Sequence, residues 1–107
     1  MKRFSVISLF PDLIRSFRDT GVIRRCVERE LIGVDMVNPR EFASDRRATV
    51  DDAPYGGGPG MVMMVQPLRK AIVAAKQSDL GTAHVIYLTP QGRRFDQEGV
   101  QELREHE

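Results

Sequence analysis

The fold is indicated most directly by Phe4-Ser5-Val6-Ile7-Ser8-Leu9-Phe10-Pro11, near the start of the chain. Its β-branched and aromatic residues predict a buried strand, which the proline closes. Leu13, Ile14 and Phe17 follow at helical spacing, so a short helix over 12–18 is expected directly after the strand. A strand that leads at once into a helix is the opening of an α/β pattern.

The same alternation continues along the chain. The further predicted elements are a helix over 22–30, a strand over 32–37, an apolar run over 61–65, a helix that opens at 66–67, a strand over 84–88 and a helix from 97 toward 104. Gly21 separates the first two helices, and Asp96 is expected to cap the last one. Strands that alternate with helices predict an α/β fold with a mostly parallel sheet and flanking helices.

Length and composition set the class of protein. The chain has 107 residues, enough for one domain, and its 41% hydrophobic and 29% charged residues exclude a disordered chain or a disulfide scaffold. Cys26 is the single cysteine, and no secretory signal is visible, so we expect a cytoplasmic protein. No apolar run approaches the roughly 20 residues that a membrane span needs, so no membrane association is expected.

Positive charge is distributed in an informative way. The net charge of +1 exerts no overall attraction toward nucleic acid, but all but three of the 16 basic residues are arginines. The planar arginine fork suits carboxylate and phosphate partners. Asp45-Arg46-Arg47 is a candidate for contact with an RNA backbone. The alternative, which the sequence leaves open, is an exposed surface with ion pairs.

The segment over 49–61 is the most informative for function. Four of the nine glycines, Gly56, Gly57, Gly58 and Gly60, lie within five residues, between Tyr55 and Met61. Glycines let a ligand approach the main chain closely, and a ring can stack on a nucleobase. The segment is neither a Walker loop nor a dinucleotide fingerprint, because no Gly-Lys-Ser/Thr follows and it precedes a strand. A flexible loop remains the alternative, although its prolines restrict the chain.

Two other places could carry chemistry. Asp51 and Asp52 are a candidate metal pair or general base, but adjacent carboxylates on an extended chain point in opposite directions, so ion pairing is the more frequent role. The stretch over 87–95 follows the predicted strand at 84–88, and ligands of open α/β sheets bind outside the carboxyl ends of strands. His84, His106 and Cys26 are scattered and form no zinc signature, so no metal ligand is predicted.

Five stretches together resemble one family. They are Ile7-Ser8-Leu9-Phe10-Pro11, Asn38-Pro39-Arg40-Glu41-Phe42, the segment over 49–61, Met63-Met64-Val65-Gln66-Pro67-Leu68 and Ile86-Tyr87-Leu88-Thr89-Pro90-Gln91-Gly92. In this order they resemble the bacterial tRNA (guanine-N1)-methyltransferases. The resemblance implies a SPOUT-class α/β fold with a deep trefoil knot and a homodimer with active sites between subunits. It also implies methyl transfer from S-adenosylmethionine to N1 of the guanine 3′ of the tRNA anticodon, with magnesium supporting activity.

The resemblance also assigns residues by position. Those implied to bind the cofactor are Tyr87, Leu88, Thr89, Pro90, Gln91 and Gly92. Those implied to close around the target guanine are Tyr55, Gly56, Gly57, Gly58, Pro59, Gly60 and Met61. Asp51 matches an acidic position beside that site, where it would aid substrate placement or magnesium binding. Arg46 and Arg47 match a loop near the RNA.

The chain departs from the family pattern in its length. Members of the family are longer, and a Cys-Gly-Arg-Tyr-Glu-Gly stretch, a further glycine loop and a tRNA-binding domain are expected after Glu107. The knot is therefore expected to be incomplete in this chain, with 1–107 as the N-terminal part of the methyltransferase domain. No catalytic base is expected here, since the family's proton-accepting aspartate lies in the later part.

Two other interpretations remain open. One is a small non-catalytic RNA- or nucleotide-binding α/β module, which a stop codon after Glu107 would favour over an enzyme fragment. The other, a nucleoside-phosphate enzyme that uses the glycine loop, is disfavoured because no lysine and Ser/Thr follow that loop.

The 107-residue piece alone is predicted to have no methyltransferase activity and at best weak cofactor binding. The N1 proton of guanine is weakly acidic, so transfer needs a positioned base as well as a donor held in line with N1. A methylation assay with unmodified tRNA checks this prediction. Tight, stoichiometric cofactor binding by the piece in a calorimetric titration would contradict it.

Overall fold

The computed structural model describes residues 1–45, 50–52, 62–77 and 83–106. Its elements are, in chain order, β1 (Lys2–Ile7), α1 (Pro11–Arg18), α2 (Gly21–Glu28), β2 (Ile32–Val37), the 3₁₀ helix η1 (Pro39–Phe42), β3 (Asp51–Asp52), β4 (Val62–Met63), α3 (Val65–Gln77) and α4 (Gln97–Arg104). The predicted α/β class with a parallel sheet and flanking helices is confirmed.

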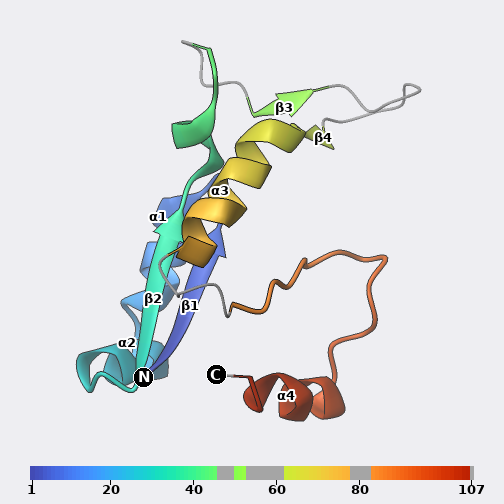
Figure 1. Ribbon diagram of the computed structural model, residues 1–107. Helices are drawn as coiled ribbons and strands as arrows, with labels where there is room; N and C mark the ends of the chain where they lie inside the picture. Colours follow the sequence, from blue (N-terminus) through green and yellow to red (C-terminus); the bar gives the residue numbers. More distant parts are fainter. Residues whose placement is uncertain (46–49, 53–61, 78–82, 107) are drawn as a thin grey trace.

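The centre of the fold is a parallel pair of strands. β1 and β2 run side by side in a register that pairs Lys2 with Ile32 and Ile7 with Val37. α1 and α2 form the crossover between them. Figure 1 shows α1 and α2 behind the two strands and α3 in front of them, so helices cover both faces of the sheet. Parallel strands usually have both faces covered. Here the cover is partial, because β1 and β2 contain no buried residue and Arg3, Phe4 and Ser5 are exposed.

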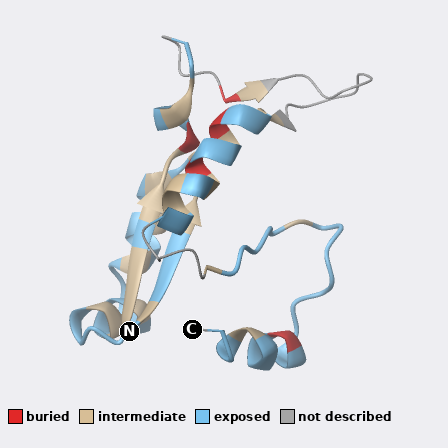
Figure 2. Cartoon of the chain, viewed as in Figure 1, coloured by how far each residue is buried: buried red, intermediate tan, exposed pale blue. Residues whose placement is uncertain are grey.

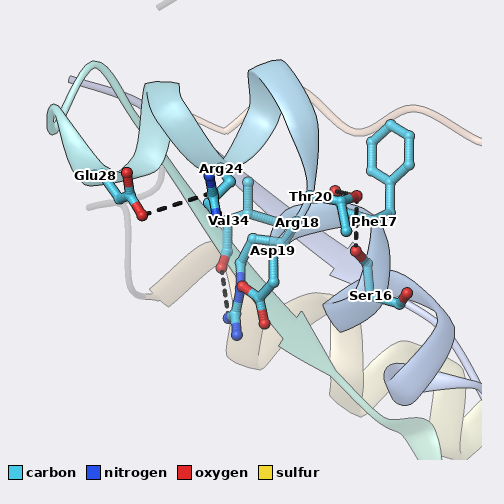
Figure 3. Close-up of polar contacts among 8 residues, drawn as sticks. All are labelled: Ser16, Phe17, Arg18, Asp19, Thr20, Arg24, Glu28 and Val34. Atoms are coloured by element: carbon cyan, nitrogen blue, oxygen red, sulfur yellow. Dashed lines mark hydrogen bonds and ion pairs between the residues drawn. The ribbon is translucent and has the colours of Figure 1, made fainter.

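Local signals in the sequence define the first two helices. Pro11 stands in the first turn of α1, where its missing N–H costs no hydrogen bond. At the other end of α1, the Thr20 hydroxyl donates to the carbonyl of Ser16 at 3.0 Å (Figure 3). Gly21 then adopts a φ of 60°, a left-handed conformation that favours glycine. The predicted break between the two helices is therefore confirmed.

An arginine joins this helical corner to the sheet. Arg18 donates from Nε to the Asp19 carboxylate at 2.9 Å and from Nη1 to the Val34 carbonyl at 3.5 Å (Figure 3). The hydrogen bond from Arg18 lowers the pKa of Asp19, and the same bond raises the pKa of Arg18. The side chain of Arg18 is 25% exposed, so this ion pair is partly sheltered from solvent.

The fully enclosed core is small and lies at one end of the molecule. Val50 and Ala71 are the buried hydrophobic residues of the described part, and Pro39 and Pro67 are buried beside them. Figure 2 shows these positions where η1, β3 and α3 meet. The chain exposes 9010 Å² of surface, whereas a compact monomer of this length exposes about 6,000 Å². Much of its apolar surface therefore lies in solvent.

The predicted strand over 84–88 is wrong. Residues 83–89 have no regular secondary structure, and Val85, Tyr87 and Leu88 are 51%, 82% and 87% exposed. A strand is defined by its hydrogen-bonded neighbour, and no described residue provides one here. The β-branched and aromatic residues of this segment favour a strand, but no neighbouring strand among the described residues pairs with it.

Three other expectations need correction. The first strand covers Lys2–Ile7 and not 4–10, because the Ser8 side chain accepts from the Phe10 N–H at 3.0 Å and turns the chain. The apolar run over 61–65 contributes only β4, which pairs antiparallel with β3, and the helix begins at Val65. η1 forms where no periodicity was visible, because the Asn38 side chain accepts from the Arg40 N–H at 3.0 Å.

The Arg18–Asp19 pair predicts a pH-dependent contribution to stability. The folded pKa of Asp19 is lowered, so its carboxylate stabilises the fold above the unfolded pKa of about 3.9, and this contribution is lost as the pH falls through the folded value. Asp19→Asn is expected to reduce the free energy of unfolding at neutral pH and to have no effect well below the folded pKa. Urea unfolding at both pH values measures this difference.

Glu28→Gln is the matched control, because Glu28 pairs with Arg24 at 3.7 Å on an exposed helix surface. Such a pair contributes at most a few tenths of a kcal/mol, about 0.3–0.5. An Asp19→Asn effect that is as large in acid as at neutral pH would show that the lost stability does not come from the ionised carboxylate.

Candidate functional site

A short hairpin anchors the glycine-rich segment at both ends. Asp51 pairs with Met63 and Asp52 with Val62, and the Met64 N–H donates to the carbonyl of Val50. Val50 is completely buried, so the base of the hairpin is fixed to the core. Figure 1 shows β3 and β4 at the N-terminal end of α3. The segment over 53–61 therefore starts and ends on a well-packed support.

Most of the predicted substrate residues lie outside the described part of the chain. These are Arg46, Tyr55, Gly56, Gly57, Gly58, Pro59, Gly60 and Met61, and the same holds for Arg47. Asp51 is described, and it is half-buried on β3. Within the described residues, no three histidine, cysteine, aspartate or glutamate side chains gather in a way that could hold a metal ion.

The predicted cofactor segment contains a well-formed turn. The Gly92 N–H donates to the Thr89 carbonyl at 3.1 Å, and the Gln91 N–H donates to the Thr89 hydroxyl at 3.3 Å. Pro90 occupies the second position of this turn, where its fixed φ is favourable. A Cβ on Gly92 would lie 3.3 Å from the Thr89 carbonyl oxygen, so a larger residue would crowd the turn. The turn expected after residue 88 is therefore confirmed.

The residues just before the turn present an apolar surface and unused main-chain groups. Tyr87 and Leu88 are 82% and 87% exposed. No hydrogen bond within the described residues engages the backbone of 85–88. Main-chain donors and acceptors beside apolar side chains are the groups that fix a flat heterocycle in small-molecule sites. The segment can therefore offer both kinds of contact to an adenine ring.

α4 holds the turn from the other side. The Asp96 carboxylate accepts from the Gly99 N–H at 2.9 Å, which confirms the predicted cap. Arg93 pairs with Glu102 at 2.7 Å, and this carboxylate raises the pKa of Arg93. Gly99 is buried against Phe95, and a Cβ there would lie 3.3 Å from the Phe95 ring. Turn and helix thus form one local unit.

Within the described residues, the β3–β4 stem and the segment over 83–96 lie apart. Figure 1 shows the segment with the turn, in orange, well away from the β3–β4 hairpin at the far end of α3. The hairpin belongs to the packed end of the molecule, whereas residues 85–88 are exposed and their backbone forms no hydrogen bond with the described residues. A common pocket of the two parts therefore needs a further protein surface.

One further surface was not predicted from the sequence, and we call it the η1–α3 groove. It lies between the two helices and is lined by Phe42, Gln66, Arg69, Lys70, Val73, Ala74 and Gln77. None of these residues was predicted to have a function. The sequence feature that could have pointed to this groove is the charge of α3, which has three basic residues and no acidic one.

Comparison with known proteins identifies the class. A solved structure, the crystal structure of tRNA (m1G37) methyltransferase from Aquifex aeolicus, is similar with a TM-score of 0.81 and 31% sequence identity over 97% of this chain and 46% of that chain. The parallel α/β arrangement with its flanking helices is thus that of the SPOUT class of proteins.

The family follows from the sequence matches. The family model of tRNA (Guanine-1)-methyltransferase TrmD matches residues 1–107, so the chain belongs to the tRNA (guanine-1)-methyltransferase family. Curated relatives named tRNA (guanine-N(1)-)-methyltransferase from Vibrio cholerae and Photobacterium profundum are 58% and 57% identical over 102 residues, 95% of this chain. The chain spans 41% of the length of these relatives.

The Asp96 cap predicts a measurable effect on α4. Asp96→Ala removes the acceptor of the Gly99 N–H and is expected to weaken the helix by about 1 kcal/mol. Amide hydrogen exchange at Gly99 should become about fivefold faster. Asp96→Asn is the control, since asparagine caps helices as well as aspartate. Unchanged exchange in Asp96→Ala would show that the cap does not hold this helix.

Proposed function

We propose that this chain forms part of an enzyme that transfers a methyl group from S-adenosylmethionine to N1 of the guanine 3′ of the tRNA anticodon. One observation carries the proposal: the chain belongs to the tRNA (guanine-1)-methyltransferase family over all of residues 1–107. The structural similarity to a tRNA (m1G37) methyltransferase agrees with it. Residues 1–107 would be the N-terminal part of a SPOUT methyltransferase domain, followed in the whole protein by a tRNA-binding domain.

The target guanine is assigned to the hairpin region. Tyr55 and the glycine-rich residues 56–61 would close around the base, with Arg46 on the RNA backbone. The support is the anchoring of this segment by the β3–β4 pairing and by buried Val50. Asp51, half-buried at the base of the hairpin, would position the substrate and not act as the base, because it is fixed within the stem.

The cofactor is assigned to the segment over 87–92. The residues present fit an adenine ring, because Tyr87 and Leu88 offer apolar surface while the backbone of 85–88 has unused hydrogen-bonding groups among the described residues. The Thr89–Gly92 turn, held by its own hydrogen bonds, would present these groups in a fixed orientation. When bound, the cofactor supplies the methyl group.

A homodimer would join the two parts of the site. In the single chain the β3–β4 stem and the turn lie apart (Figure 1). Four large apolar side chains on and beside α1 are exposed. These side chains are 67–70% exposed: Phe10, Leu13, Phe17 and Val22. Apolar surface of this extent is typical of a protein–protein interface. A second copy could therefore cover it and supply the missing side of the pocket.

The proposed function also concerns the base, the metal and the compartment. Proton removal from N1 is assigned to a residue outside the described part of the chain, because the resemblance places the family's proton-accepting aspartate in the later part of the enzyme. Magnesium would act through substrate phosphates and Asp51, because the described residues hold no metal-ligand cluster.

The protein would work in the cytoplasm, where tRNA is found. Among the described residues, no helix is long and apolar enough to span a membrane.

The reaction itself is testable with the longest product of the gene that encodes this chain. It is expected to transfer a labelled methyl group to an unmodified tRNA transcript that has guanine 3′ of the anticodon. A transcript with adenine at that position should accept none. Nuclease digestion and mass spectrometry would locate the methyl group on N1. Transfer to another nucleotide, or no transfer, would overturn the proposed activity.

The cofactor assignment predicts the effect of a charge at Leu88. Leu88→Asp is expected to weaken S-adenosylmethionine binding roughly tenfold or more, because a carboxylate would have to be buried against the adenine ring. Leu88→Met keeps the apolar volume and should bind within about twofold of the unaltered protein. Isothermal titration calorimetry of both variants in the longest product of the gene measures this, since the 107-residue piece alone is expected to bind the cofactor weakly at best. Equal affinity of the two variants would exclude this segment from the adenine site.

A further inference from the structure

The η1–α3 groove combines two kinds of surface. Phe42 lines it from η1, while Val73 and Ala74 line it from α3, so its floor is apolar. Arg69 and Lys70 stand along it with their charged ends exposed. The groove has a volume of about 380 Å³, which is at the lower end of the usual range for small-ligand sites, about 300–1,000 Å³. It is therefore an open groove with room for about one nucleotide-sized group.

The two cations of this groove are not paired within the described part of the chain. Several arginines elsewhere do form ion pairs with carboxylates, among them Arg3–Asp35, Arg18–Asp19 and Arg93–Glu102. Neither Arg69 nor Lys70 forms an ion pair with any described residue, and the lining of the groove contains no carboxylate from that part of the chain. A pair of cations without a nearby anion favours a ligand that brings its own negative charge.

The groove is also continuous with the substrate region. α3 begins directly after β4, and Gln66 at the start of the groove lies four residues after Val62 of the hairpin. The N-terminal end of α3 carries the positive end of the helix dipole and lies beside β3 and β4 (Figure 1). A chain that enters the hairpin region can therefore continue along α3 past Arg69 and Lys70.

We propose that the η1–α3 groove binds the sugar–phosphate backbone of the tRNA next to the target nucleotide, with Arg69 and Lys70 on phosphates and a ribose or base on the apolar floor. The proposal rests on the proposed function, because it names a contact of the same RNA substrate. Aromatic and aliphatic side chains between cations are the combination that single-stranded RNA requires, since it presents flat apolar faces and charged phosphates in alternation. Arg69 and Lys70 are thus positioning residues for the RNA.

The test uses the longest product of the gene and an unmodified tRNA transcript. Replacing both cations, Arg69→Gln with Lys70→Gln, keeps most of each side chain and removes only the charges. The dissociation constant for tRNA should rise roughly tenfold at about 0.1 M salt, and the slope of log K against log salt should flatten by about 1.5. Lys76→Gln is the matched control, on the same helix but outside the lining of the groove. It should change the dissociation constant by less than about twofold.

A second pair of variants isolates charge from packing. Val73 lines the groove and is 47% exposed, so it tolerates a polar side chain. Val73→Glu places a carboxylate among the phosphates and should weaken tRNA binding several-fold more than Val73→Gln, which has the same shape. The affinity for S-adenosylmethionine should be unchanged in all of these variants, which verifies that they fold.

The outcomes separate this proposal from the proposed function. Failure of the unaltered protein to bind or methylate tRNA would overturn the proposed function itself. Methylation by the unaltered protein, together with an unchanged tRNA affinity and salt slope in the double variant, would overturn the groove proposal alone. If the double variant binds tRNA as tightly as the unaltered protein but has a different oligomeric state, the groove would instead bind an acidic protein surface.

Discussion

The other elements of the fold are arranged around the parallel pairing of β1 with β2. Parallel strands cannot be joined by a tight turn, so the chain between them must cross over, and here α1 and α2 form the crossover. Arg18 binds this crossover to the sheet through the Val34 carbonyl. Because β2 ends at Val37, η1 and then the hairpin and α3 all start from the same end of the sheet (Figure 1). The positions of the candidate substrate elements follow from that one pairing.

Packing is concentrated where these elements meet. Val50, Pro39 and Ala71 are buried at the junction of η1, β3 and α3, while large apolar side chains on α1 and over 85–95 are exposed. The best-packed place in the described chain is therefore the base of the hairpin that holds the glycine-rich segment. A loop that binds a ligand benefits from such a support, because binding loops are most effective when a rigid scaffold positions them.

The two candidate binding segments are built by different physical means. The hairpin is held by tertiary packing, through buried Val50 and the pairing of Asp51 with Met63. The turn over 89–92 is held by local bonds: Thr89 accepts two N–H groups, and the capped helix α4 follows at once. A local unit keeps its shape without the rest of the fold. For that reason the turn is well formed even though the segment before it pairs with nothing in the described chain.

Features that depend on near neighbours could be predicted from the amino-acid sequence alone. The short helix that follows the first strand, the break at Gly21 and the Asp96 cap are determined within a few residues, as is the turn at Pro90. Packing in three dimensions was needed to establish that 84–88 is not a strand, that β4 pairs antiparallel with β3, and that Phe42, Arg69 and Lys70 share a groove. Strand formation and groove lining depend on which residue lies across from another in space, and periodicity along the chain carries no such information.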